Sequence, residues 1–228
     1  MKKFLALALA ALVAMPTVTM AQKTTVQRVT REKTYETQKT DVSIWYQGEL
    51  SFGFATGSNL TYKSEGVSSK QKTDLSRPFI ETVHGVRITQ YAFVGLGLGV
   101  QYAYGKMNPD YNESENWGAL LMPIFVNLKG YYPVSDNFAP YVTVSLGGTA
   151  SLTSNIDDSG YEYYYGNWEE KLTGGFYSKV GLGLSYRKFM FDFGLMHQNM
   201  GFKYTIDGTS EKEKASTNAF YVNLGFKF

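Results

Sequence analysis

The amino-acid sequence predicts an all-β protein: a transmembrane, antiparallel, up-and-down β-barrel of eight strands. Apolar residues alternate with small or polar residues in one segment after another, which is the period of a strand with two different faces. The connectors between these segments are alternately long and short, an asymmetry typical of barrels in membranes. After residue 21, no apolar run approaches the roughly 18 residues that indicate a membrane-spanning helix.

Eight segments carry the alternation. The clearest is 92–102, where every even-numbered residue is apolar and the other face holds three glycines and Gln101. The weakest is 79–88, where Ile80, Val86 and Ile88 make the apolar face. The predicted strands span residues 44–55, 79–88, 92–102, 119–129, 141–150, 176–186, 189–198 and 220–228.

The other six segments each have one apolar face, and these faces predict the strands individually. In chain order the faces are Tyr46, Leu50, Phe52 and Phe54; Leu120, Met122, Ile124, Val126 and Leu128; Val142, Val144 and Leu146; Phe176, Val180, Leu182, Leu184 and Tyr186; Phe189, Phe191, Phe193 and Leu195; and Phe220, Val222, Leu224, Phe226 and Phe228. Long polar connectors are predicted at 56–77, 105–117, 153–171 and 200–217, and short ones at 89–91, 131–140 and 187–188. An even number of strands leaves both termini at the short-turn, periplasmic side.

Composition excludes several classes of function. The chain has no cysteine, so disulfides, cysteine-bound zinc, iron–sulfur clusters and thiol nucleophiles are ruled out. Lys and Arg number 22 against 20 Asp and Glu, and the net charge of +2 is too small for a nucleic-acid-binding surface. We therefore expect no nucleic-acid partner. The 23 glycines and 18 tyrosines favour β structure.

The N-terminal segment, residues 1–21, has the pattern of a secretory signal peptide. A basic start, an apolar run and a small-x-small cleavage site follow one another at Lys2-Lys3, 4–14 and Thr19-Met20-Ala21. Residues 22–42 are polar and lack an apolar period, so they predict a flexible periplasmic leader. The barrel is expected to occupy residues 43–228 in the outer membrane.

Alternation alone does not decide which face lies inside, since a secreted soluble barrel would turn its apolar face inward. Two features favour the membrane barrel. The less apolar face is small and polar with isolated charges, as in a wet or tightly packed lumen. Tyrosine and tryptophan gather near segment ends, as in interfacial girdles, at Trp45, Tyr46, Tyr91, Tyr102, Tyr104, Trp117, Tyr131, Tyr132, Tyr141 and Tyr186.

The last predicted strand alternates apolar residues and finishes on an aromatic one, at Phe220, Val222, Leu224, Phe226 and Phe228. This pattern resembles the C-terminal signal of outer-membrane barrels, which implies recognition by the barrel-insertion machinery. Segments 85–97 and 123–131 resemble strand-turn-strand units of small OmpX/OmpA-like and PorT-like barrels, and the resemblance covers most of residues 43–228. It implies contact with outer-membrane lipid and lipopolysaccharide in a Gram-negative cell. The resemblance specifies a fold and brings no catalytic motif with it. The family includes adhesins and assembly factors, so the resemblance does not define one function.

Charged side chains of both signs fall on the predicted inward face, at Glu49, Glu81, Arg87, Lys129, Lys179, Asp192 and Lys227. Charges in a narrow lumen must pair or be hydrated. Inward glycines leave room for Phe125, Tyr177 and Tyr221, so we expect a plugged lumen and a structural or surface-binding role. A narrow passive channel for small solutes is the alternative.

The third long connector is the most distinctive predicted surface feature, with aromatic residues at Tyr161, Tyr163, Tyr164, Tyr165 and Trp168. Tyrosine and tryptophan offer large, rigid contact area at low entropic cost, so this loop is a candidate for binding a surface ligand. The alternative is a strand extension that holds its aromatic rings at the level of the lipid headgroups.

Little in the sequence indicates catalysis, and no metal or other cofactor is expected. The two histidines, His84 and His197, have no metal-ligand spacing around them. A hairpin across 187–188 would put Ser178 opposite His197 on the outward face, where they could serve a lipid A-modifying hydrolase as nucleophile and base. No third, orienting group is evident, so we predict no enzyme and interpret the pair as contacting lipid headgroups. The apparent outward position of His84 is interpreted as a register error or a bulge.

Overall fold

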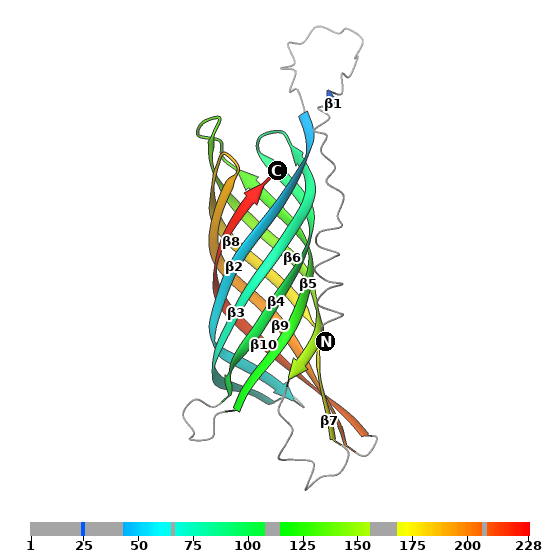
Figure 1. Ribbon diagram of the computed structural model, residues 1–228. Helices are drawn as coiled ribbons and strands as arrows, with labels where there is room; N and C mark the ends of the chain where they lie inside the picture. Colours follow the sequence, from blue (N-terminus) through cyan, green and yellow to red (C-terminus); the bar gives the residue numbers. More distant parts are fainter. Residues whose placement is uncertain (1–23, 26–42, 65–66, 108–114, 156–167, 207–208) are drawn as a thin grey trace.

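The computed structural model is a closed, all-antiparallel β-barrel (Figure 1). The structure describes residues 24–25, 43–64, 67–107, 115–155, 168–206 and 209–228. Its strands are β1 (Thr24–Thr25), β2 (Ser43–Ser64), β3 (Val67–Ile88), β4 (Ala92–Met107), β5 (Glu115–Tyr131), β6 (Phe138–Asn155), β7 (Trp168–Thr173), β8 (Phe176–Tyr186), β9 (Phe189–Ile206) and β10 (Thr209–Lys227). In this part of the chain, no helix has the length and apolar character needed to cross a membrane.

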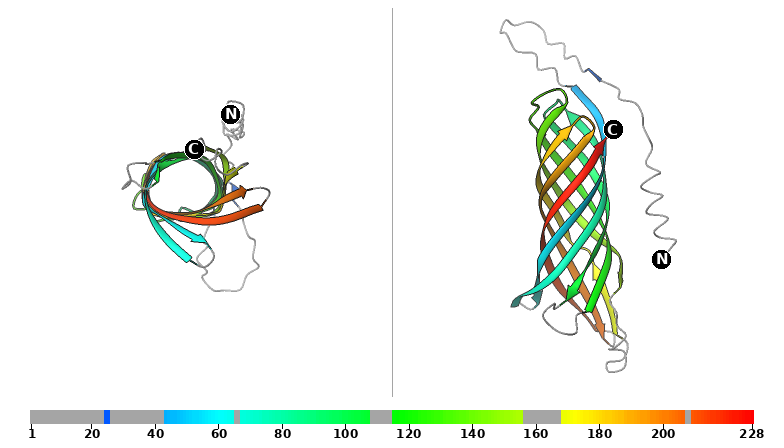
Figure 2. Two further views of the ribbon diagram at one scale, coloured as in Figure 1. Left: turned by 90° about the horizontal axis from the view of Figure 1, so that it is seen from below. Right: turned by 60° about the vertical axis from the view of Figure 1, so that its left-hand side comes forward.

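The barrel has eight strands, as the sequence predicts. β7 and β8 are two parts of one barrel strand, because both pair with β9 and only Gly174 and Gly175 separate them. Around the barrel the order is β2-β10-β9-β8-β6-β5-β4-β3, and pairing of β3 with β2 closes it (Figure 2). Each strand of the closed wall therefore has a paired neighbour on both sides, which leaves the barrel without an open edge.

The strands are longer than the sequence predicts at the end away from the short turns, which we call the long-hairpin end. The β2–β3 hairpin pairs as far as Ser64 and Val67, so most of the expected connector 56–77 is strand. Strand pairing likewise shortens the expected connectors 105–117, 153–171 and 200–217. Strands pair through their backbones, so a strand can continue into a polar segment that has no apolar face. Such polar extensions show no alternation of apolar and polar residues, and the sequence pattern therefore does not predict them. Figure 2 shows the tips of β2–β3 and β9–β10 splaying away from the barrel.

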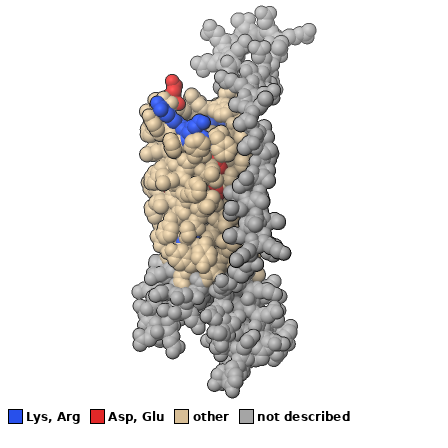
Figure 3. All heavy atoms as spheres, viewed as in Figure 1, with Lys and Arg blue, Asp and Glu red and all other residues tan. Residues whose placement is uncertain are grey.

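The short turns lie where they were predicted. Residues 89–91 join β3 to β4, and Arg187-Lys188 joins β8 to β9. Thr89 and Arg187 have φ of 57° and 52°, the left-handed conformation that lets a tight hairpin follow the twist of its strands. The charged residues visible in Figure 3 gather mainly at this short-turn end, above a wall of mostly uncharged atoms.

The apolar faces of β2 to β6 and of β8 to β10 point outward where their side chains are described, which confirms the membrane-type arrangement of faces. β8 alternates strictly: Leu182 is 57% exposed, whereas Lys179 and Ser185 are buried. On β10, Leu224 is 64% exposed between the buried Tyr221 and the inward-facing Gly225. A predominantly apolar belt of this kind is the surface that faces hydrocarbon in transmembrane barrels.

Inward glycines make room for inward rings, as predicted for Phe125 and Tyr221. A Cβ atom on Gly97 would overlap the ring of Phe125, and one on Gly181 would overlap the hydroxyl end of Tyr221. Each ring therefore lies against the inner wall over a nearby strand that has no side chain at that position. This exchange of bulk lets the narrow barrel enclose large side chains.

The predicted aromatic girdle is only partly correct. Six of its tyrosines are exposed on the outer wall near strand ends, at Tyr46, Tyr91, Tyr102, Tyr104, Tyr132 and Tyr186. Tyr131 and Tyr141 are instead buried and paired across β5 and β6, with ring centroids 5.2 Å apart. Tyr131 and Tyr132 are consecutive, so alternation sends one of them inward. Trp45 also turns inward, toward Arg87; the side chain of Trp117 lies outside the described residues.

Candidate functional site: the barrel lumen

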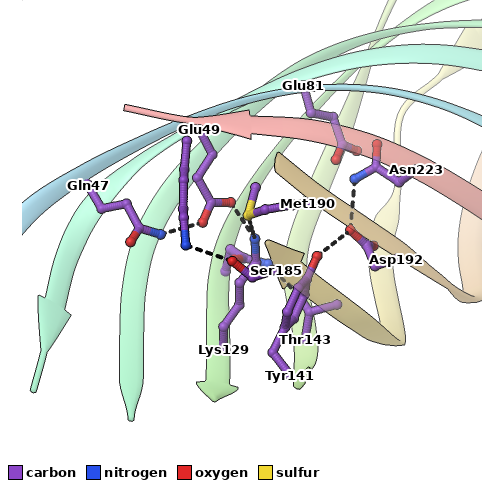
Figure 4. Close-up of polar contacts among 12 residues, drawn as sticks. Gln47, Glu49, Glu81, Lys129, Tyr141, Thr143, Ser185, Met190, Asp192 and Asn223 are labelled. Atoms are coloured by element: carbon purple, nitrogen blue, oxygen red, sulfur yellow. Dashed lines mark hydrogen bonds and ion pairs between the residues drawn. The ribbon is translucent and has the colours of Figure 1, made fainter. Parts of the chain in front are cut away.

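The lumen contains three layers of polar and aromatic side chains, and the layer nearest the short turns centres on Glu49. Glu49 on β2 forms an ion pair with Lys129 on β5, from the far side of the lumen (Figure 4). Gln47 Nε2 donates to Glu49 Oε1 over 2.8 Å. The Lys129 ammonium also lies 5.2 Å from the ring centroid of Tyr141. Both charged groups are buried, and each is neutralised by the other.

Asp192 on β9 is held in the same layer by neutral donors. The Tyr141 hydroxyl donates to Asp192 Oδ2 over 2.9 Å, and Asn223 Nδ2 donates to the same oxygen over 3.1 Å (Figure 4). Asp192 is buried, and no Lys or Arg of the described residues forms an ion pair with it. Hydrogen bonds to an ionised carboxylate are stronger than neutral ones, so these donors stabilise its charge.

The short-turn end of the lumen holds two cations that form no ion pair with an acidic residue among the described residues. Arg87 donates from Nη2 to the Gln90 carbonyl over 2.8 Å, and its guanidinium lies 3.9 Å from the Tyr131 ring centroid. Lys227 donates to Ser185 Oγ over 2.6 Å. Stacking on an aromatic face compensates part of the desolvation of a guanidinium.

The middle layer combines the second ion pair with aromatic rings. Lys179 on β8 pairs with Glu81 on β3 at 2.5 Å, again across the lumen. The Tyr177 hydroxyl donates to the other Glu81 oxygen over 2.8 Å. The Lys179 ammonium lies 5.1 Å from the ring centroids of both Phe79 and Tyr221. This layer therefore places aromatic rings around a neutralised charge pair.

The third layer, toward the long-hairpin end, was missed by the sequence prediction. Arg77 on β3 is fully buried and donates from Nη1 to Gln198 Oε1 over 2.7 Å. Gln198 Nε2 in turn donates to Thr149 Oγ1 on β6 over 3.0 Å. Arg77 fell in the expected connector 56–77 because Pro78 and the polar residues before it hide the strand. Counting back by twos from Glu81 through Phe79 would have placed Arg77 inward.

All seven charged residues predicted for the lumen face inward, but they do not form one cluster. Glu49, Lys129, Asp192, Arg87 and Lys227 lie toward the short turns, and Glu81 with Lys179 lies in the middle layer. Alternation assigns a face but not a partner, because partners across a barrel depend on strand tilt and stagger. The pairs Glu49–Lys129 and Glu81–Lys179 could therefore be read only from the structure.

The structure describes the side chains of the predicted insertion signal but not those of the predicted binding loop. Tyr161, Tyr163, Tyr164 and Tyr165 lie outside the described residues, and so does the side chain of Trp168, whose backbone begins β7. The side chains Phe220, Val222, Leu224, Phe226 and Phe228 all point outward. Phe228 exchanges two backbone hydrogen bonds of 2.9 Å with Gly48 and so closes the seam between β10 and β2.

A row of polar residues on three neighbouring strands ends the apolar belt on one side of the barrel. The register places Ser178 opposite His197, as predicted, and His197 opposite Asn218. His197 Nδ1 donates to Asn218 Oδ1 over 2.7 Å, so an orienting group that was not evident in the sequence is present. No hydrogen bond joins Ser178 to His197 among the described contacts. A groove of about 620 Å³ adjoins this row and is lined by His197, Asn199 and Lys214 among others.

His84 truly faces outward, so its interpretation as a register error or a bulge was wrong. The β2–β3 register runs without a shift through Gly48↔His84. Both ring nitrogens of His84 form hydrogen bonds, one with the Tyr46 hydroxyl at 2.5 Å and one with Thr82 Oγ1 at 2.9 Å. These bonds satisfy the polar atoms of the ring and so lower the cost of placing a histidine on the outer wall. Within the described residues no group of three or more His, Asp or Glu side chains could hold a metal ion.

Comparison with solved structures places the chain among small outer-membrane barrels at the level of the fold. The outer membrane protein OprG from Pseudomonas aeruginosa matches with a TM-score of 0.54 and 14% identity, over 80% of this chain and 95% of that chain. The outer membrane protein AlkL matches with 14% identity over 89% and 97% of the two chains, and Ail of Yersinia pestis with 10% over 80% and 99%. Their TM-scores of 0.47 and 0.35 are too low to support an argument.

The chain matches no protein-family model and no curated protein. The structural likeness confirms the resemblance to small outer-membrane barrels that the last strand and segments 85–97 and 123–131 indicate.

Proposed function

We propose that the protein is an integral outer-membrane β-barrel whose lumen is plugged by its own side chains and whose role is structural or lies in binding at the cell surface. The outward apolar belt supports the membrane location, because a soluble protein with such a belt would aggregate. The predicted signal peptide 1–21 would export the chain. The predicted leader 22–42 and the short turns would then lie in the periplasm, and the long hairpins outside the cell.

The proposal of a plugged lumen depends on one observation. Both buried ion pairs cross the lumen, and aromatic rings surround the Glu81–Lys179 pair. Lys179 and Glu81 are 4% and 2% exposed along their side chains, so water does not surround either group. An eight-stranded barrel is just wide enough inside for side chains. Rings and paired charges at successive levels therefore leave no room for a hydrated ion to pass.

A narrow passive channel for small solutes is the competing function. It is favoured by the polar groups that continue along the lumen from Lys227 through Glu49 and Glu81 to Arg77. Proteoliposomes that contain the purified barrel separate the two functions by their swelling in isotonic glycine or arabinose. We expect the swelling rate of protein-free vesicles, whereas solute-dependent swelling that scales with the amount of barrel would establish the channel.

Surface binding would be carried by the strand extensions and the loop with Tyr161, Tyr163, Tyr164, Tyr165 and Trp168. Replacing all five residues by Ser should leave the heat-modifiable barrel intact and abolish binding to a host or cell surface. A barrel with this loop replaced that adheres as well as the wild type would remove the loop from the proposal. The outer wall would contact lipid and lipopolysaccharide through its apolar belt and polar row.

The last strand would serve as the insertion signal for the barrel-insertion machinery. Its five outward residues make the apolar stripe that such machinery reads, and Phe228 also closes the seam with Gly48. Export without assembly is therefore the expected phenotype when Phe228 is lost. Fractionation that recovers the Phe228→Ala protein in the outer membrane at wild-type levels would contradict this role.

We propose no enzymatic activity, although the row Ser178, His197 and Asn218 presents a nucleophile, a base and an orienting group in order. The orienting group is a neutral amide rather than a carboxylate, and Ser178 donates no hydrogen bond to His197 in the described structure. Lipid A from cells that express the barrel should therefore be unmodified by mass spectrometry. Deacylated lipid A that disappears in Ser178→Ala or His197→Ala would establish a hydrolase instead.

A further inference from the structure

The outer wall carries an apolar groove of about 570 Å³ beside the turn Arg187-Lys188, which we call the short-turn groove. Its volume lies within the range of about 300–1,000 Å³ that is typical of ligand pockets. Leu184 and Phe191 line it, and its side chains are open to the surroundings, as Phe189 is at 65% exposure. The pairing register sets a further row of its lining residues side by side on five neighbouring strands, at Leu50, Phe226, Phe189, Tyr186 and Phe138.

Two positive charges lie over rings of the short-turn groove. The Arg187 guanidinium is 5.6 Å from the ring centroid of Tyr186, and the Lys188 ammonium is 5.6 Å from the ring centroid of Phe226. Both separations are within the roughly 6 Å over which a cation is attracted to an aromatic face. The two side chains therefore fold back over the groove, and their charged ends lie at its margin.

The turn that carries these two cations is tied to its neighbours on both sides. The Arg187 amide donates to the Asn137 carbonyl over 2.7 Å, and the Lys227 amide donates to the Lys188 carbonyl over 2.7 Å. No ion pair among the described residues involves Arg187 or Lys188. The backbone is therefore held in place, while both charges remain available to a ligand.

The other two short turns carry no positive charge. Residues 89–91 contain no charged side chain, and residues 132–137 contain only Asp136. Lys and Arg side chains are visible at this end of the barrel, directly above the uncharged wall (Figure 3). Among the short turns, positive charge is thus confined to the one that adjoins the groove, so the two features mark a single sector of the barrel.

A groove that lies on the lipid-facing wall and ends under two cations matches an amphiphile with a negative head and an apolar tail. Basic clusters at a membrane surface attract anionic lipids. We propose that the short-turn groove binds an anionic glycerophospholipid of the periplasmic leaflet. Its phosphate lies beside Arg187 and Lys188, and an acyl chain lies along Leu184 and Phe191. The site rests on the proposed function for its membrane location and orientation, but not on the plugged lumen.

The binding test compares two lipids that have the same acyl chains but different headgroups. Native mass spectrometry of the full-length barrel, released from detergent micelles, measures the binding of phosphatidylglycerol and of phosphatidylcholine. Phosphatidylcholine is zwitterionic and has no net charge, so phosphatidylglycerol should bind about tenfold or more tightly. Glycerol 3-phosphate, which is a headgroup without acyl chains, should not displace the lipid even in large excess, because it leaves the groove empty.

The variants remove the cations without disturbing the turn. Lys188→Gln should weaken phosphatidylglycerol by about fivefold, the contribution of one basic residue at an anionic surface. Arg187→Asn keeps a residue that tolerates the φ of 52° and should have a similar effect. Lys214→Gln, which removes an exposed lysine from the long-hairpin end, is the matched control and should bind like the wild type. Outer-membrane levels should not change, because insertion is assigned to the last strand.

Several results would overturn the lipid site while leaving the barrel in place. These are equal affinity for the two lipids in the folded wild type, unchanged phosphatidylglycerol affinity in the double variant Arg187→Asn/Lys188→Gln, or an equal loss in Lys214→Gln. Displacement by glycerol 3-phosphate would show a simple anion site, and tighter binding of lipid A through the same two cations would overturn the assignment to a phospholipid. A wild-type chain without the heat-modifiable band shift would instead overturn the proposed membrane barrel, and the site with it.

Discussion

Replacing Lys179 by Met removes one partner of the ion pair in the middle layer and preserves most of its volume. Both groups are buried, so the change leaves Glu81 without a counter-charge in the lumen. Losing one partner of a buried pair costs about 3–5 kcal/mol in unfolding free energy. Glu81 keeps the 2.8 Å hydrogen bond from Tyr177, which places the expected loss at the lower end, about 3 kcal/mol.

The double variant Glu81→Gln/Lys179→Met separates a charge effect from a packing effect. It removes both charges while the amide can still accept a hydrogen bond from Tyr177, so no buried ion remains unpaired. Neutral replacements of whole buried pairs are often neutral or stabilising, and we expect the double variant to lie within about 1 kcal/mol of the wild type. Glu81→Gln alone should cost about as much as Lys179→Met, which gives a coupling of several kcal/mol.

The assay is urea unfolding in detergent micelles, followed by tryptophan fluorescence and by the heat-modifiable shift on gels. Val180→Ala, a change at the adjacent outward residue, controls for a general effect of altering β8. The reasoning is refuted if Lys179→Met unfolds at the wild-type urea concentration. It is equally refuted if the two single losses simply add in the double variant, because additivity would mean that the charges do not stabilise each other.

Other perturbations test other parts of the structure. Gly97→Ala should lower the unfolding free energy of the barrel by about 1–3 kcal/mol, because the added Cβ overlaps the Phe125 ring. Gly148→Ala, whose added Cβ has its nearest atom at 3.6 Å, should unfold at the same urea concentration as the wild type. Phe228→Ala should lower outer-membrane levels without affecting export, checked by fractionation against Lys188→Ala; equal levels would contradict the insertion role. Lys129→Met should destabilise the barrel by about 3–5 kcal/mol in urea without raising proteoliposome swelling; faster swelling would mean that the residue gates a pore.

The sequence predicts the wall of the barrel well because one rule governs it. A period of two fixes the face of each residue, and the apolar belt repeats that rule on every strand. Leu182 outward and Lys179 inward follow directly from alternation in β8. The same rule, applied without interruption, would have predicted Arg77 inward as well. Pro78 and the polar residues before it form no apolar face, so the apolar alternation that predicts β3 begins only at Phe79.

Contacts across the lumen lie beyond that rule. Glu49 and Lys129 are 80 residues apart, and their meeting depends on how far each strand is staggered around the barrel. Tyr131 and Tyr141 illustrate a second limit. A tyrosine at the end of a strand fits both an interfacial girdle and a lumen plug, and only the parity of its position decides. The outward position of His84 depends on hydrogen bonds with the side chains of Tyr46 and Thr82, which alternation does not predict.

Single-channel recording across a planar lipid bilayer tests the plugged lumen most directly. The purified wild-type barrel, folded by the heat-modifiability criterion, should give no steady conductance in 1 M KCl, a concentration at which the Debye length of about 3 Å leaves little long-range electrostatic barrier. The double variant Phe125→Ala/Tyr177→Ala, which removes two facing rings of the middle layer, should give small, resolvable steps. Steady steps of the same size from the wild type and the double variant would contradict the plug and establish an open path through the barrel.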